Sequence, residues 1–134
     1  MNHNIDELIP SAMDAAKKYI VNYKPIYNKY KGAIPSEYNG YISSFGGAVL
    51  QSGLKAAVAF NENTNTDAEK DKKPLMNAIL AIVTQNDQED YKSLLDYILS
   101  HPDEASKIQA SILDAATALK LVIRTFELKK EVKR

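Results

Sequence analysis

Residues 105–126, ASKIQASILDAATALKLVIRTF, decide the fold class because their apolar side chains recur at the period of an α-helix. Leu113, Leu121 and Leu128 lie off the main apolar seam, so the helix is apolar on more than one side. Such a helix is either central in its own bundle or shared with another chain. We predict that it is the longest helix of the protein. The seam itself consists of positions three or four residues apart: Ala105, Ile108, Ile112, Ala115, Leu119, Val122 and Phe126.

The rest of the chain also has helical patterns, and the sequence predicts an all-α, single-domain bundle of five to six helices over residues 1–134. No stretch alternates apolar and polar residues for long, so strand signals are missing. The apolar residues of 75–83 go nearly all the way round a helix, which again indicates a central or shared position. Helices are expected at 5–23 (or from residue 10), 36–45, 48–60, 75–86 and 87–99, followed by the long C-terminal helix, and a short helical piece is expected at 26–30 in addition.

Local signals set the expected ends of these helices. Ser36 and Asp87 are candidate N-caps, and Pro25 is expected to end or kink the first helix. Ser100 with Asp103 resembles a capping box for the last helix. Residues 61–73, NENTNTDAEKDKK, are polar and without periodicity, so we expect an exposed, mobile loop there.

Composition excludes several classes of protein. The chain has 134 residues and no cysteine, so disulfides and thiolate metal sites are excluded. Its first residues do not resemble a secretion signal, and no apolar run is long enough for a membrane span. We therefore expect a cytoplasmic protein with no membrane association.

The charges are unevenly distributed along the chain, although 17 basic and 17 acidic residues give a net charge of zero. Residues 15–36 contain five lysines and no acid, and residues 120–134 contain six basic residues and two glutamates. Between 62 and 104, ten acids face four lysines. Two basic segments therefore flank an acidic middle, a pattern that bears on partners and not on fold.

The stretch GGAVLQSGLKAAVAF, residues 46–60, places three of the five glycines within an apolar helical pattern. Each glycine costs a helix about 1 kcal/mol relative to alanine, so a compensating use is expected. Rows of small side chains let another backbone approach, either in an intramolecular helix crossing or in the docking of a partner helix. The glycine pair is also expected to bend or break the helix. The expected helix-contact residues are Gly46, Gly47, Gly53 and Ala57.

The segment KKYIVNYKPIYNKYK, residues 17–31, has two interpretations. Its tyrosines, at positions 19, 23, 27 and 30, could form a packed stripe with the lysines as a solvated face, which composition alone favours. Alternatively, lysines neutralise phosphates while tyrosines stack on bases. Cations near residues 124–134 could join this segment if the two ends of the chain are adjacent. The candidate RNA-contacting residues are Lys17, Lys18, Lys24, Lys29, Lys31, Lys55, Arg124, Lys129 and Lys130.

No pattern indicates a catalytic centre. His3 and His101 have no neighbours arranged to tune them, and the sequence lacks a nucleophile elbow and a spaced set of metal ligands. We therefore predict no catalysis, no metal and no cofactor. The acids at predicted helix starts are assigned a capping role: Asp87, Glu89, Asp90, Asp103 and Glu104.

The aromatic-rich N-terminal helix, YISSFGGAVLQSGLKAAVAF at 41–60 and the closing helix ATALKLVIRTFELKK at 116–130 together resemble one known family. It is the small all-helical subunit of type III-B CRISPR RNA-targeting effector complexes, the fifth component of the RAMP module. The resemblance implies a non-enzymatic subunit that forms a short filament of copies beside RAMP-type backbone subunits. It also implies that basic side chains help to hold target RNA through phosphates, without base reading and with no role for DNA.

A second class of function remains open from the residues alone. The chain could be a helical protein–protein adaptor or a homodimeric bundle with no nucleic-acid role. The salt dependence of RNA binding separates the two, because only phosphate contacts make affinity fall steeply with salt.

Overall fold

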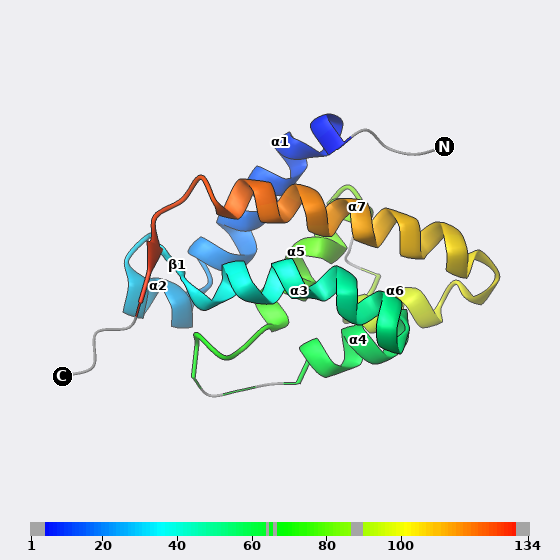
Figure 1. Cartoon of the computed structure of the whole chain (residues 1–134). Coiled ribbons are helices and arrows are strands. Elements are labelled where there is room, and N and C mark those ends of the chain that lie inside the picture. The colour runs from blue at the N-terminus through cyan, green and yellow to red at the C-terminus, as the bar shows by residue number, and fades with distance from the viewer. Residues whose placement is uncertain (1–4, 64, 66, 87–89, 131–134) are drawn as a thin grey trace.

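The computed structural model describes residues 5–63, 65, 67–86 and 90–130, which form an all-α bundle (Figure 1). A π-helical turn, η1 (Lys17–Val21), a 3₁₀ turn, η2 (Pro102–Glu104), and two short strands, β1 (Ile34–Pro35) and β2 (Leu128–Lys129), complete it. The predicted fold class is confirmed, and α7 is the longest helix described. The α-helices are α1 (Ile5–Ala16), α2 (Lys24–Tyr30), α3 (Glu37–Ser52), α4 (Leu54–Asn61), α5 (Lys73–Val83), α6 (Leu94–Leu99) and α7 (Ala105–Ile123).

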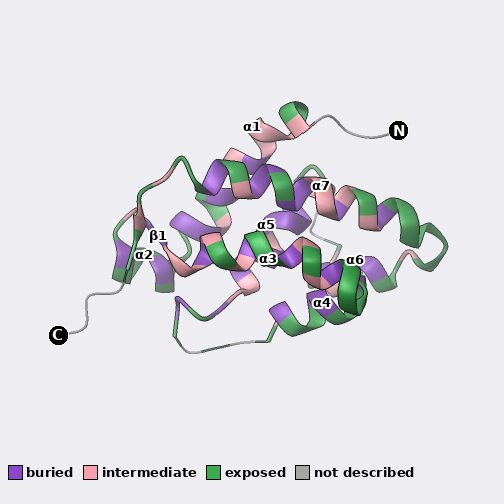
Figure 2. Ribbon diagram, in the orientation of Figure 1, coloured by how far each residue is buried: buried purple, intermediate pink, exposed green. Residues whose placement is uncertain are grey.

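Helix α7 is central, because α1, α3 and α5 all pack against it. Five of the seven predicted seam residues are buried: Ile108, Ile112, Ala115, Leu119 and Val122. The seam prediction is wrong at Ala105, which is exposed; Phe126 lies beyond the end of the helix but is half-buried and packs against the core. Helix α5 is buried on almost every side, so its all-round apolar pattern reflects a position inside the bundle (Figure 2).

The N-terminal segment changes direction twice before α3. Helix α1 contains Pro10 and continues into η1, which ends at Val21 and is followed by Asn22 in the C-cap position. The predicted 5–23 helix is therefore α-helical only as far as Ala16. Helix α2 has Pro25 in its first turn and ends at Tyr30, and the next residue, Lys31, has a left-handed backbone with φ of 53°. Proline at the start of α2 and a left-handed residue at its end keep it short.

A pair of strands joins distant parts of the chain. Ile34 and Pro35 pair in parallel with Leu128 and Lys129, and the Ile34 amide donates to the Glu127 carbonyl at 2.9 Å. No sequence signal predicted these strands. Two residues are too few to show an alternating pattern, so the pairing depends on how the helices bring the two segments together.

The predicted break at the glycine pair is wrong. Helix α3 continues through Gly46 and Gly47, and the break comes at Gly53, which has φ of 95° and separates α3 from α4. Gly53 therefore does not share a helix face with Gly46, because a left-handed residue cannot continue a right-handed helix. A Cβ on Gly46 would lie 3.9 Å from a Leu113 methyl of α7, whereas one on Gly47 or Gly53 would meet no atom within 4 Å. Ala57 is buried in α4.

Substitution with alanine should affect Gly53 and Gly47 in opposite directions. Gly53→Ala is expected to lower the free energy of unfolding by about 1–3 kcal/mol, because a side chain strains a left-handed backbone. Gly47→Ala should raise it by about 0.5–1 kcal/mol, since Gly47 is exposed inside a regular helix. Urea unfolding of both variants checks the signs. A Gly53→Ala variant as stable as the parent would contradict the assignment.

The 61–73 segment is not uniformly exposed, contrary to expectation. Ala68, Glu69 and Asp71 are buried. The buried Tyr38 hydroxyl donates to the backbone carbonyls of Asp71 and, at 3.3 Å, of Ala68. Burial, followed by the nearby Asp71 carboxylate, raises the Tyr38 pKa well above its usual value. The tyrosine thus fixes this segment to α3.

The predicted 87–99 helix is much shorter in the structure. Helix α6 begins at Leu94, and the Ser93 hydroxyl accepts from the Asp96 amide at 3.0 Å. Glu62, at the end of α4, accepts from the Leu94 and Leu95 amides at 3.2 Å. Burial raises the Glu62 pKa above its usual value, while these two amides oppose the shift. A carboxylate that is distant in sequence therefore accepts the hydrogen bonds of the first free amides of α6.

Two of the predicted caps did not form, and one lies outside the described residues. The Ser100 hydroxyl donates back to the Asp96 carbonyl at 2.8 Å, so the capping box predicted for the last helix is wrong. Ser36 is in the N-cap position of α3, but its side chain makes no capping hydrogen bond. Asp87 and Glu89 belong to the residues that the structure does not describe. Of the helices described, none is both long and apolar enough to cross a lipid bilayer.

Candidate nucleic-acid interface

The two basic segments of the sequence meet at one end of the molecule. Strand β1 follows α2, and its pairing with β2 places the C-terminal segment beside it (Figure 1). The Ser36 amide donates to the Lys129 carbonyl at 3.0 Å, which fixes the backbone of β2. We define the basic end as Lys24, Lys29, Lys31, Lys129 and Lys130, all of them exposed.

One lysine of the basic end is already neutralised. The Lys29 ammonium lies 2.9 Å from a carboxylate oxygen of Glu69, and the Glu69 side chain is only 9% exposed. This ion pair ties α2 to the 62–72 segment, so Lys29 is less available to a phosphate than its neighbours. Nothing in the local sequence indicated the pair, because the partners are 40 residues apart.

The remaining lysines of the N-terminal segment face solvent. Lys17 and Lys18 lie on η1, and Lys24 and Lys31 lie at the two ends of α2. Within the described part of the chain, no carboxylate forms an ion pair with these four side chains. These four cations can therefore neutralise phosphates of a nucleic acid, and the release of the cations condensed on that nucleic acid favours association.

Of the tyrosines in residues 17–31, some belong to the packed core and others are exposed to a possible nucleic-acid partner. Tyr30 is 2% exposed and belongs to the core, and Tyr19 is half-buried. Tyr23 and Tyr27 are 38% and 47% exposed, so their rings are open to a partner. The Lys31 ammonium lies 5.9 Å from the centre of the Tyr27 ring, which places a cation and an aromatic face side by side.

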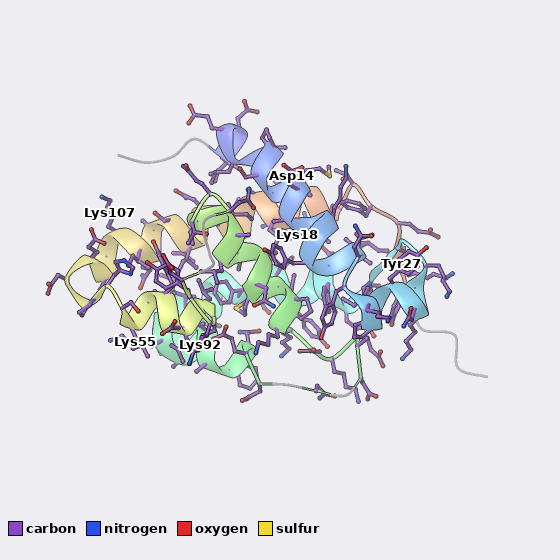
Figure 3. The ribbon with its side chains drawn as sticks, turned by 180° about the vertical axis from the view of Figure 1, so that it is seen from behind. Asp14, Lys18, Tyr27, Lys55, Lys92 and Lys107 are labelled. Atoms are coloured by element: carbon purple, nitrogen blue, oxygen red, sulfur yellow. The ribbon has the colours of Figure 1, made fainter. Side chains whose placement is uncertain are left out.

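Two further sequence candidates, Lys55 and Arg124, are not part of the basic end as defined above. Lys55 lies on α4, at the opposite end of the molecule from Tyr27 (Figure 3). Arg124 follows α7, and its guanidinium donates to the side chains of Asn39 at 2.9 Å and Ser43 at 3.4 Å. Arg124 therefore holds α7 to α3. Lys18, on η1, lies between Lys55 and Tyr27 in the view of Figure 3.

A further cationic group was missed by the sequence analysis. The Lys72 ammonium lies 4.7 Å from the Tyr41 ring centre and 4.6 Å from the Phe60 ring centre. Burial, followed by the Glu37 and Glu69 carboxylates, raises the Tyr41 pKa above its usual value. No local pattern could have revealed the arrangement, because α3, α4 and the segment before α5 each contribute one residue.

The chemistry available at the basic end is phosphate binding. Lysine ammonium groups neutralise phosphates without reading bases, and exposed tyrosines can stack on any base. Among the described residues, no group of three or more His, Asp or Glu side chains is placed to hold a metal ion. These side chains therefore have the chemistry to contact phosphates and bases without reading a sequence.

The comparison with protein families agrees with the resemblance seen in the sequence. The model of the CRISPR-associated protein (Cas_Cmr5) family matches residues 12–126. No curated protein and no solved structure matches the chain. The matched region includes all of α2 to α7 and the whole of the N-terminal basic segment, 17–31. Because the match covers most of its 134 residues, the chain belongs to the CRISPR-associated Cas_Cmr5 family, the small subunit of type III-B Cmr complexes.

Proposed function

We propose that this chain is a non-catalytic, cytoplasmic subunit of an antiviral type III-B effector complex. In this proposal it assembles beside RAMP-type backbone subunits and further copies of itself. Its basic end then holds target RNA through phosphate contacts that do not depend on sequence. Family membership supports the assembly of this chain into an effector complex. The proximity of two basic segments that are about a hundred residues apart supports the contact with RNA.

The charge distribution supports RNA binding within a complex and not by the free subunit. The net charge is zero, and ten acids lie between residues 62 and 104. These acids oppose long-range attraction of a polyanion to the isolated chain. Once backbone subunits hold RNA nearby, the basic end needs only short-range contacts, which salt screens less than long-range attraction.

Charge reversal at the basic end tests the proposal. Lys24→Glu with Lys130→Glu should weaken target-RNA binding by the assembled complex and leave the fold intact. The slope of log affinity against log salt should become shallower by about 0.7 for each phosphate that the variant no longer neutralises. Binding titrations at several salt concentrations measure this slope.

The matched control reverses the same number of charges elsewhere. Lys92→Glu with Lys107→Glu alters exposed lysines that lie at the other end of the molecule from Tyr27 (Figure 3). The control should keep the parental affinity and slope. If both double variants behave alike, the basic end has no special role, and a protein–protein adaptor without an RNA contact becomes the better explanation.

A further inference from the structure

The last turn of α4 carries an aromatic ring that the core does not use. Phe60 is 65% exposed. A single exposed apolar side chain is ordinary on a protein surface. Phe60 differs because a cation is fixed beside it, the Lys72 ammonium at 4.6 Å from the ring centre. The ammonium lies over one face of the ring, which leaves the other face open to solvent.

Both the backbone and the ammonium of Lys72 are held in place by the fold. Just before Lys72, the buried Tyr38 hydroxyl donates to the Asp71 carbonyl. Lys72 itself occupies the N-cap position of α5, and its carbonyl accepts an amide of the first helical turn at 3.0 Å. The ammonium lies over the Tyr41 ring as well as the Phe60 ring. The cation is therefore positioned before any ligand arrives.

The charge of Lys72 is not neutralised within the molecule. Among the described residues, no carboxylate forms an ion pair with it. The nearby acids have other partners, because Glu69 pairs with Lys29 at 2.9 Å and Asp67 pairs with Lys70 at 3.6 Å. Lys72 is therefore available to an anion from outside the chain.

The pair formed by Phe60 and Lys72 lies within reach of the basic end. Residues 67–72 lie between the end of α4 and α2 (Figure 1). Lys29 of the basic end pairs with Glu69, and Glu69 is three residues from Lys72, at most about 11 Å along an extended backbone. One strand of RNA can therefore contact the basic end and this pair together.

We propose that Phe60 and Lys72 form a second RNA contact, which takes one unpaired nucleotide. This inference rests on the proposed function and adds a contact to a base. The base stacks on the open face of Phe60, and Lys72 neutralises a neighbouring phosphate. A base stacked on a protein ring is splayed out of its helix, so the site selects single-stranded RNA. It has no sequence preference, because every base has a face that can stack.

The chemistry of the pair fits a nucleotide better than a protein side chain. An apolar side chain that covered Phe60 would also bury the Lys72 ammonium without a partner, which is costly. A nucleotide brings a flat ring and a phosphate together, so it satisfies both groups. The same combination recurs at the basic end, where the Lys31 ammonium lies 5.9 Å from the centre of the exposed Tyr27 ring.

Ring variants in the assembled complex test the stacking. Phe60→Ala should lower RNA affinity about five- to a hundredfold, the usual loss for one stacked base. Phe60→Leu is the matched variant, because it keeps an apolar side chain without a ring, and it should lose as much. Phe60→Tyr should keep the parental affinity. The salt slope should not change in these variants, whereas Lys72→Gln should make it shallower by about 0.7, since only the lysine neutralises a phosphate.

RNAs that lack one base at a time locate the stacked nucleotide. At that position the parent complex should bind the intact RNA more tightly than the abasic RNA, and the Phe60→Ala complex should bind both equally. Leu99→Ala is the control, because Leu99 is also exposed, at 55%, and lies on α6. It should keep the parental preference at every position. Circular dichroism spectra of all variants should match the parent.

Three results would overturn the proposal. Parental affinity in Phe60→Ala or Phe60→Leu would exclude stacking, and so would an affinity loss that is the same for intact and abasic RNA at every position. A Phe60→Ala subunit that folds but no longer joins the complex would assign this face to a protein contact. The variant Lys24→Glu with Lys130→Glu should still weaken RNA binding in all three cases, so failure here is distinct from failure of the proposed function.

Discussion

Replacing Tyr38 with alanine is expected to lower the free energy of unfolding by about 3–5 kcal/mol, one of the two largest effects that the structure predicts. The ring is 0% exposed, so its removal leaves a cavity in the core. The hydroxyl also donates to the Asp71 and Ala68 carbonyls, and these acceptors would lose their partner. Urea unfolding measures the loss.

A conservative variant separates the two contributions. Tyr38→Phe keeps the ring and removes only the hydroxyl, so it should cost about 1–3 kcal/mol. Hydrogen exchange should become faster in residues 67–73, because the hydroxyl is a main link between this segment and α3. Tyr27→Ala is the control, since its ring is 47% exposed and its loss should change stability by no more than about 0.5 kcal/mol. Equal stability of parent and Tyr38→Phe would show that the hydroxyl does not anchor the segment.

Replacing Leu119 with alanine should have a similar effect, about 2–5 kcal/mol. Leu119 is 0% exposed on α7, the helix against which α1, α3 and α5 pack. Because three helices pack against α7, none can move inward without separating from the others, so the cavity should persist. Thermal and urea unfolding check the loss of stability.

Leu121 supplies the matched control for Leu119. It is the same residue type on the same helix, two positions away, and is 45% exposed. Leu121→Ala should change the free energy of unfolding by no more than about 0.5 kcal/mol. Losses of similar size in the two variants would mean that α7 is not the central helix of the bundle.

The helical fold could be predicted from sequence because its signals are local. The spacing of Ile108, Ile112 and Leu119 is the spacing of one helix face, and the structure buries all three. The all-round apolar pattern of α5 likewise indicated a helix inside a bundle. Such patterns depend on side chains within one or two turns of each other, and their spacing can be read from the sequence.

The predictions from sequence were wrong where residues distant in the chain determine the local structure. The start of α6 moved to Leu94, where the Glu62 carboxylate of α4 accepts the first amides of the helix. The 61–73 segment has a polar, aperiodic sequence, yet Tyr38 fixes part of it in place. Gly53, and not the Gly46–Gly47 pair, breaks the helix, because a glycine tolerates both helical and left-handed backbone and the surroundings choose between them.

By itself, the sequence determined that this protein is helical, that α7 is its longest helix, and which segments carry positive charge. It could not determine that Lys24 and Lys130 lie at the same end of the molecule, or that Glu69 neutralises Lys29. Periodicity and charge are properties of a short stretch of chain. The meeting of two basic segments depends on packing between helices and on the β1–β2 pairing, which join residues about a hundred positions apart.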